Sequence, residues 1–97
     1  MTDFQKTSSL ALTQLADFFE SSWPIADIDL LEDALIVILP GNNQYLINKH
    51  GVTKQIWVSS PFTGAHHFSY QEGKWLCTRT GELLGDLLRA EQETYAA

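Results

Sequence analysis

A chain of 97 residues is long enough to bury one hydrophobic core, and its 44% hydrophobic content is that of an ordinary globular protein. One cysteine excludes an internal disulfide, and a net charge of −6 disfavours nucleic acid and anionic membranes as partners. The N-terminus lacks the features of a signal or transit peptide, and the longest apolar run, 34–39, is too short to span a bilayer, so we expect a cytoplasmic protein.

The first predicted element is a helix over residues 7–22. Its apolar residues recur at the i, i+3, i+4, i+7 spacing of one buried stripe: Ala11, Leu12, Leu15, Phe18 and Phe19. Trp23-Pro24 ends the helix, because a residue before proline is pushed out of the helical region.

Six strands separated by short turn signals follow this helix. We expect them over residues 27–30, 35–39, 44–48, 53–61, 65–70 and 74–78. A last helix is expected from near Thr80, a good N-cap, with Glu82 in its first turn and an apolar stripe of Leu83, Leu84, Leu87 and Leu88.

This order of elements predicts an α+β fold. The short connections favour an antiparallel meander, and two helices cannot cover both faces of such a sheet. We therefore expect a two-layer α/β sandwich of the order α-β(6)-α, with both helices on one face of the sheet and the other face in water.

The strand around Trp57 presents a large aromatic side chain on its polar face. Ile56 and Val58 point to one side, while Gln55, Trp57 and Ser59 point to the other. Two interpretations stay open at this point. Trp57 is covered by neighbours in the fold, for example Leu46, or it is an interaction hot spot for a partner.

No catalytic constellation is recognisable in the sequence. Cys77 alternates with its neighbours in a strand, which favours a core packing residue over a reactive thiol. His66 and His67 are adjacent in a strand, so their side chains point to opposite faces and cannot chelate one metal ion together. A weak metal contact through one of them is the alternative to a polar surface role.

Acidic residues are concentrated at the N-terminal end of the chain. Residues 1–33 carry seven acids and one base, whereas no acid lies between Ala34 and Gln71. If the first strand runs beside the first helix, one acidic ridge forms from Asp17, Glu20, Asp27, Asp29, Glu32 and Asp33. Oxygen ligands suit Fe³⁺ and, less selectively, Fe²⁺, Mn²⁺ or Ca²⁺, and such an exposed site would be weak and exchangeable. The alternative is a solvated acidic face.

The element order and several motifs resemble the frataxin family, in particular its bacterial, CyaY-type branch. The matching segments are 45–49, 54–61, 64–68, 74–77, 80–82 and 86–88, of which Asn48-Lys49 with Lys54-Gln55-Ile56-Trp57 and Ser59-Ser60-Pro61 is the most specific. The likeness covers about residues 10–95, so we expect one frataxin-like domain over 1–97. Phe18, Phe19, Ser21 and Ser22 interrupt the run of acids that family members usually carry at the end of the first helix.

The resemblance implies a non-enzymatic, iron-binding accessory protein of iron–sulfur cluster assembly. It implies binding of Fe²⁺ and Fe³⁺ by the acidic ridge, and docking on a cysteine desulfurase and its scaffold protein, with a monomer expected and an iron-induced oligomer as the alternative. The implied partner-binding residues on the sheet face are Asn48, Gln55, Trp57 and His67. Two other hypotheses remain: a ferroxidase that stores iron in oligomers, and a plain protein-binding module with incidental metal binding.

Overall fold

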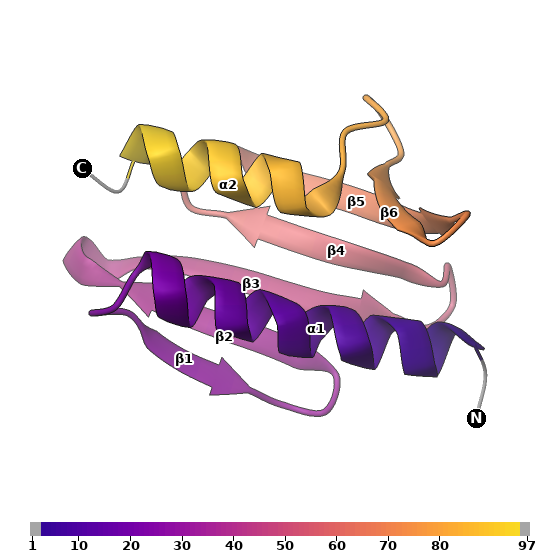
Figure 1. Ribbon diagram of the computed structural model, residues 1–97, viewed down its shortest axis with the longest axis horizontal. Coiled ribbons are helices and arrows are strands. Elements are labelled where there is room, and N and C mark those ends of the chain that lie inside the picture. Colours follow the sequence, from indigo (N-terminus) through magenta and orange to yellow (C-terminus); the bar gives the residue numbers. More distant parts are fainter. Residues whose placement is uncertain (1–2, 96–97) are drawn as a thin grey trace.

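The computed structural model describes residues 3–95 of the chain, and its two helices and six strands follow the predicted order (Figure 1). The elements are α1 (Asp3–Ser22), β1 (Asp27–Leu30), β2 (Ala34–Leu39), a short 3-10 helix (Pro40–Asn42), β3 (Asn43–His50), β4 (Gln55–Ser60), β5 (Gly64–Gln71), β6 (Lys74–Cys77) and α2 (Leu84–Tyr95). Within this part of the chain, neither helix combines the length and apolar composition that a membrane crossing requires.

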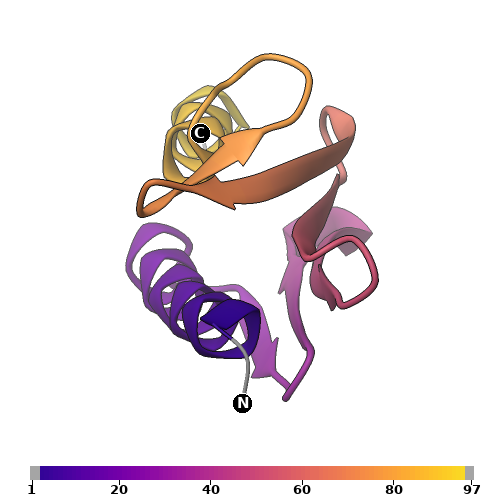
Figure 2. The ribbon, with the colours of Figure 1, turned by 90° about the vertical axis from the view of Figure 1, so that its right-hand side faces the viewer.

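All six strands form one antiparallel sheet in the order β1-β2-β3-β4-β5-β6. Each strand pairs with its neighbour in sequence because the connections are too short for a crossover. Both helices lie on the same side of the twisted sheet, and the other side is bare (Figures 1 and 2). This arrangement confirms the predicted two-layer sandwich with one open sheet face.

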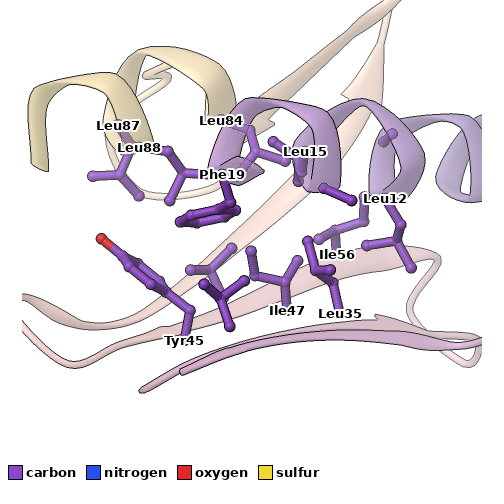
Figure 3. Close-up of a cluster of buried hydrophobic side chains, with 14 of the residues drawn as sticks. Leu12, Leu15, Phe19, Leu35, Tyr45, Ile47, Ile56, Leu84, Leu87 and Leu88 are labelled. Atoms are coloured by element: carbon purple, nitrogen blue, oxygen red, sulfur yellow. The ribbon is translucent and has the colours of Figure 1, made fainter. Parts of the chain in front are cut away.

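The core lies between the helices and the sheet (Figure 3). From α1, Leu12 and Phe19 are almost completely buried, as predicted from the apolar stripe, whereas Phe18 is half-buried. Beneath them lie side chains that alternate along β2, β3 and β4: Leu35, Val37, Tyr45, Ile47, Ile56 and Val58. Because side chains alternate across a strand, the residues between these core positions point to the open face of the sheet.

The start of α2 differs from the prediction. The helix begins at Leu84 instead of near Thr80, and Asp86 takes the place of Glu82 as the acid in its first turn. The Thr80 hydroxyl does accept a hydrogen bond from the Glu82 N–H at 3.1 Å, but this bond closes a turn outside the helix. Glu82 is held extended, since its carbonyl accepts from the Cys77 N–H at 2.8 Å and its neighbour Leu83 bridges to Leu76.

Two other elements, α1 and β3, exceed their predicted length by three residues or more. Helix α1 begins at Asp3, where Phe4 adds a buried contact with Trp75 at a ring distance of 6.1 Å. Strand β3 continues to His50, which pairs with Gln55 of β4. This extension places one more side chain on the open sheet face, because His50 has the same parity as Asn48.

Candidate functional site

The predicted partner-binding residues all lie on the open sheet face. Asn48, Trp57 and His67 are directly paired across β3, β4 and β5, so their side chains form one row. Gln55 lies two residues before Trp57 on the same side of β4. Apolar side chains of β2 and β3 extend this surface: Ile38 is 44% exposed and Leu46 is 38% exposed.

Trp57 is covered on both faces of its indole by histidine rings. His50 stacks at a ring-centroid distance of 3.9 Å and 7° between planes, and His67 stacks at 4.2 Å and 11°. The indole Nε1–H donates to Gln55 Oε1 at 2.8 Å. Neighbours in the fold therefore do cover part of Trp57, and the neighbours that stack on it are the two histidines. Leu46, the neighbour suggested from the sequence, is paired with Ser59. A role for Trp57 in partner binding stays a prediction.

The six predicted ridge acids are all exposed, and they lie in three places. Asp17 and Glu20 lie on the solvent side of α1, and Glu32 and Asp33 lie in the turn between β1 and β2. Asp27 and Asp29 pair with Ile38 and Ile36, and the intervening Ile28 packs against the core. The β1 acids therefore point to the open sheet face and lie on the same side of the sheet as Trp57, three strands away.

No preformed metal cage is built by these acids. Within residues 3–95, no three His, Cys, Asp or Glu side chains are grouped so that they could hold a metal ion. Over the same residues the one salt bridge joins Arg89 and Asp86, so no ridge acid is neutralised by a salt bridge in the described part of the chain. The ridge is thus a negatively charged edge that could attract a hard cation, and its metal role stays a prediction.

The other predicted candidates lie on the helix side of the sheet. His66 pairs with the buried Val58 and so faces away from His67, as predicted. Cys77 is buried in the core cluster, in agreement with a packing role. Burial raises the pKa of Cys77, but hydrogen bonds from the Thr80 side chain and from the Arg79 and Thr80 backbone outweigh this, and the net shift is downward.

A buried carboxylate on α2 was not found from the sequence. Glu91 is only 3% exposed and accepts three hydrogen bonds from hydroxyls: Tyr45 at 2.7 Å, Ser60 at 2.6 Å and Thr63 at 2.6 Å. The pKa of Tyr45 is raised far above its ordinary value, mainly by burial and next by the hydrogen bond to Glu91 and its charge. The phenol therefore stays a donor. Figure 3 shows the Tyr45 hydroxyl directed from the sheet toward α2. One signal in the sequence could have found it: Glu91 follows Leu88 by three residues, and this helical spacing places it near the buried face.

A family model described as a frataxin-like domain matches residues 1–97. The chain belongs to the frataxin-like family. The mitochondrial frataxin homolog of Saccharomyces cerevisiae is 36% identical over 69 residues, which are 71% of this chain and 40% of the yeast protein. The chain thus spans less than half the length of that relative.

Two further comparisons concern a bacterial relative and a solved structure of this family. The iron–sulfur cluster assembly protein CyaY of Vibrio atlanticus is 24% identical to this frataxin-like chain over 95 residues, which are 98% of this chain and 90% of the relative. The crystal structure of trimeric yeast frataxin, complexed with ferrous iron, superposes with a TM-score of 0.76 at 27% identity and covers 97% of this chain and 86% of the yeast chain. The frataxin and CyaY family handles iron and takes part in iron–sulfur cluster assembly, and its members are in general not enzymes.

Proposed function

We propose that this chain is an iron-binding accessory protein that acts on a cysteine desulfurase and its scaffold protein during iron–sulfur cluster assembly. The cysteine desulfurase would meet the acidic ridge through basic surface of its own, and the scaffold protein would meet the Trp57 side of the sheet. The proposal includes one domain over residues 1–97, a monomeric resting state and a cytoplasmic location.

The strongest support is the open sheet face with its row of Asn48, Trp57 and His67. A sheet backed by two helices holds these side chains on a rigid platform, and aromatic side chains are favoured at the centres of protein interfaces. Exposed Ile38 and Leu46 add apolar area to the platform. Such a surface suits a protein partner better than a small substrate, which is usually held in a concave pocket.

The iron-binding part of the proposal depends on the acids at the β1 edge. Asp27 and Asp29 alternate with Ile28, so their carboxylates share one side of an edge strand, which in the described sheet pairs only with β2. Oxygen ligands without a closing histidine or cysteine suit Fe²⁺ or Fe³⁺ in weak, exchangeable binding. A carrier that passes iron on needs such binding, since a closed cage would retain the ion.

Substitution of Asp27 and Asp29 by asparagine is expected to weaken Fe²⁺ binding by about tenfold, because two of the charges that attract the cation are lost while the side-chain shape is kept. An anaerobic NMR titration with Fe²⁺ would measure this change and would show which amides lose intensity. The matched control is Glu82→Gln with Glu93→Gln, which removes two exposed acids outside the ridge. Equal Fe²⁺ binding by both double variants would place the metal elsewhere.

The same NMR experiment with the desulfurase and with the scaffold protein tests the partner assignment. We expect the desulfurase to shift amides of α1 and β1, and the scaffold protein to shift amides of β3, β4 and β5. If desulfurase binding survives a ridge neutralisation that abolishes iron binding, the protein is a binding module for which iron is incidental. Absence of binding to both proteins would overturn the proposed function.

A ferroxidase that stores iron in oligomers is the second candidate, and the trimeric yeast relative favours it. This candidate requires growth of the particle on addition of Fe²⁺ together with consumption of O₂. Light scattering with an oxygen electrode separates the two candidates, because an accessory protein that carries iron keeps its size and consumes no more O₂ than free Fe²⁺ does.

A further inference from the structure

Three parallel rings stand together at the centre of the open sheet face. They belong to His50 on β3, Trp57 on β4 and His67 on β5, with the indole in the middle at 3.9 Å and 4.2 Å from the two imidazoles. The two imidazoles lie on opposite faces of the indole, so they are not arranged to chelate one ion. The arrangement instead places two titratable groups against the face of the aromatic side chain that has the greatest affinity for cations.

Each ring of this stack is held by a hydrogen bond or by strand pairing. His50 Nδ1 lies 2.7 Å from Thr53 Oγ1, and the Trp57 indole N–H is bound to Gln55 Oε1 at 2.8 Å. His67 is the direct cross-strand partner of Trp57. When His50 is protonated, its Nδ1–H can donate to the Thr53 oxygen, which leaves its Nε2–H available to a partner.

The charges around the stack leave its centre free of acids. The sheet-face positions of β2, β3, β4 and β5 carry no acid, since residues 34–71 contain none. On the same face, Lys74 lies on β6, and Asp27 and Asp29 lie on β1 at the far edge. The side chain of Lys49 is turned to the helix side, where it binds Ser9. The turns at the His50 end of the sheet carry charges of both signs, from Glu32, Asp33, Lys54 and Glu72.

We propose that the His50–Trp57–His67 stack is a proton-gated binding site for carboxylates of the protein that docks on this face. An imidazole ordinarily changes its charge between pH 5 and 8. Protonation adds up to two positive charges beside an acid-free centre, and a cation over an indole face is stabilised by the ring. A docking segment with aspartate or glutamate would then form charge-assisted hydrogen bonds with the imidazolium N–H groups.

The sign of the pH dependence follows from this assignment. If the protonated stack binds more tightly, complex formation takes up protons, and the affinity rises as the pH falls. One proton taken up changes the dissociation constant by as much as about tenfold per pH unit. We therefore expect the scaffold protein to bind at least about tenfold more tightly at pH 6 than at pH 8. This inference rests on the proposed function, which assigns the scaffold protein to this face.

The experiment is isothermal titration calorimetry of the scaffold protein into the full chain at pH 6, 7 and 8, repeated in buffers of different ionisation enthalpy to count protons. The chain contains three histidines, and the third supplies a matched control. His66 faces the helix side and is bound to Thr63, and glutamine at this position keeps an N–H donor. The variants are therefore His50→Gln with His67→Gln, and separately His66→Gln, each with its thermal unfolding recorded at every pH.

Loss of the pH dependence and of proton uptake in the His50→Gln, His67→Gln variant, with both retained in His66→Gln, is the expected result. The same pH dependence in all three proteins would assign the titration to the scaffold protein and overturn this inference, while the proposed function would stand. A dissociation constant that rises as the pH falls would also overturn it. If the wild type binds no scaffold protein at any pH, the inference and the docking part of the proposed function fall together.

Discussion

Replacement of Glu91 by alanine is expected to lower the free energy of unfolding by roughly 3–5 kcal/mol. The carboxylate is the shared acceptor for the hydroxyls of Tyr45, Ser60 and Thr63. Alanine would remove all three bonds, and a buried donor left without a partner costs about 1–3 kcal/mol. Tyr45 is fully buried, so its hydroxyl has no route to bulk water.

Urea unfolding measures this effect, provided that the slope of the transition is unchanged. Glu93→Ala is the matched control, because Glu93 lies on the same helix and is exposed, and its loss should stay within about 0.5 kcal/mol. The loss of unfolding free energy in Glu91→Gln should lie between those of Glu91→Ala and Glu93→Ala. One side-chain oxygen still accepts a hydrogen bond, while the amide N–H group faces hydroxyl donors. Equal stability of Glu91→Ala and Glu93→Ala would show that the buried cluster contributes nothing.

The cluster also gives a structural reason for the serine at position 60. Ser60 Oγ accepts from the N–H groups of Phe62 and Thr63 at 3.0 Å and 3.2 Å, and it donates to Glu91. The serine thus closes the turn between β4 and β5 and joins this turn to α2. Part of the motif that carries the family resemblance is explained by folding and needs no role in partner binding.

Replacement of Trp57 by alanine is expected to weaken binding of the scaffold protein by about 30-fold or more, which corresponds to the 2 kcal/mol of an interface hot spot. Its effect on folding should be smaller, about 1–2 kcal/mol, because the half-buried indole loses two stacked imidazoles but no core contact. Calorimetric titration and urea unfolding of the same variant separate the two effects.

Tyr70→Ala is the matched control for Trp57→Ala. Tyr70 is 43% exposed, lies on the helix side of β5 and contacts Trp75 at a ring distance of 5.0 Å. Its removal costs a comparable aromatic contact outside the open sheet face, so binding should be unchanged. Trp57→Phe should recover part of the affinity. Unfolding of Trp57→Ala would identify Trp57 as a core residue, and unchanged affinity would remove it from the interface.

The periodicity of the sequence was sufficient to predict the layers of the fold. Ile56 and Val58 alternate with Trp57, and this two-residue period assigned them correctly to the core and the open face. The stripe through Leu12 and Phe19 located the buried side of α1 in the same way. These predictions succeeded because alternation and helical spacing are local properties of the backbone, and burial of the apolar side follows from them.

Predictions that required contacts between distant segments were incomplete. Thr80 has the residue type of an N-cap, but the bridge from Leu76 to Leu83 keeps the following residues extended, and the helix starts later. The predicted strand 44–48 ends before His50, whereas pairing with Gln55 extends β3 through this residue. Glu91 has the appearance of a surface acid, and its burial depends on hydroxyls that lie 28 to 46 residues away in sequence.

The sequence by itself determined the order of the elements, the two-layer architecture and the concentration of acids at one end of the chain. It also determined that Trp57 stands on the polar side of its strand, because side-chain direction in a strand follows from position alone. Only the tertiary structure decided what surrounds these groups. Strand register placed His50 and His67 on the two faces of Trp57, and it turned Asp27 and Asp29 to the same face of the sheet. Register is set by pairing between strands.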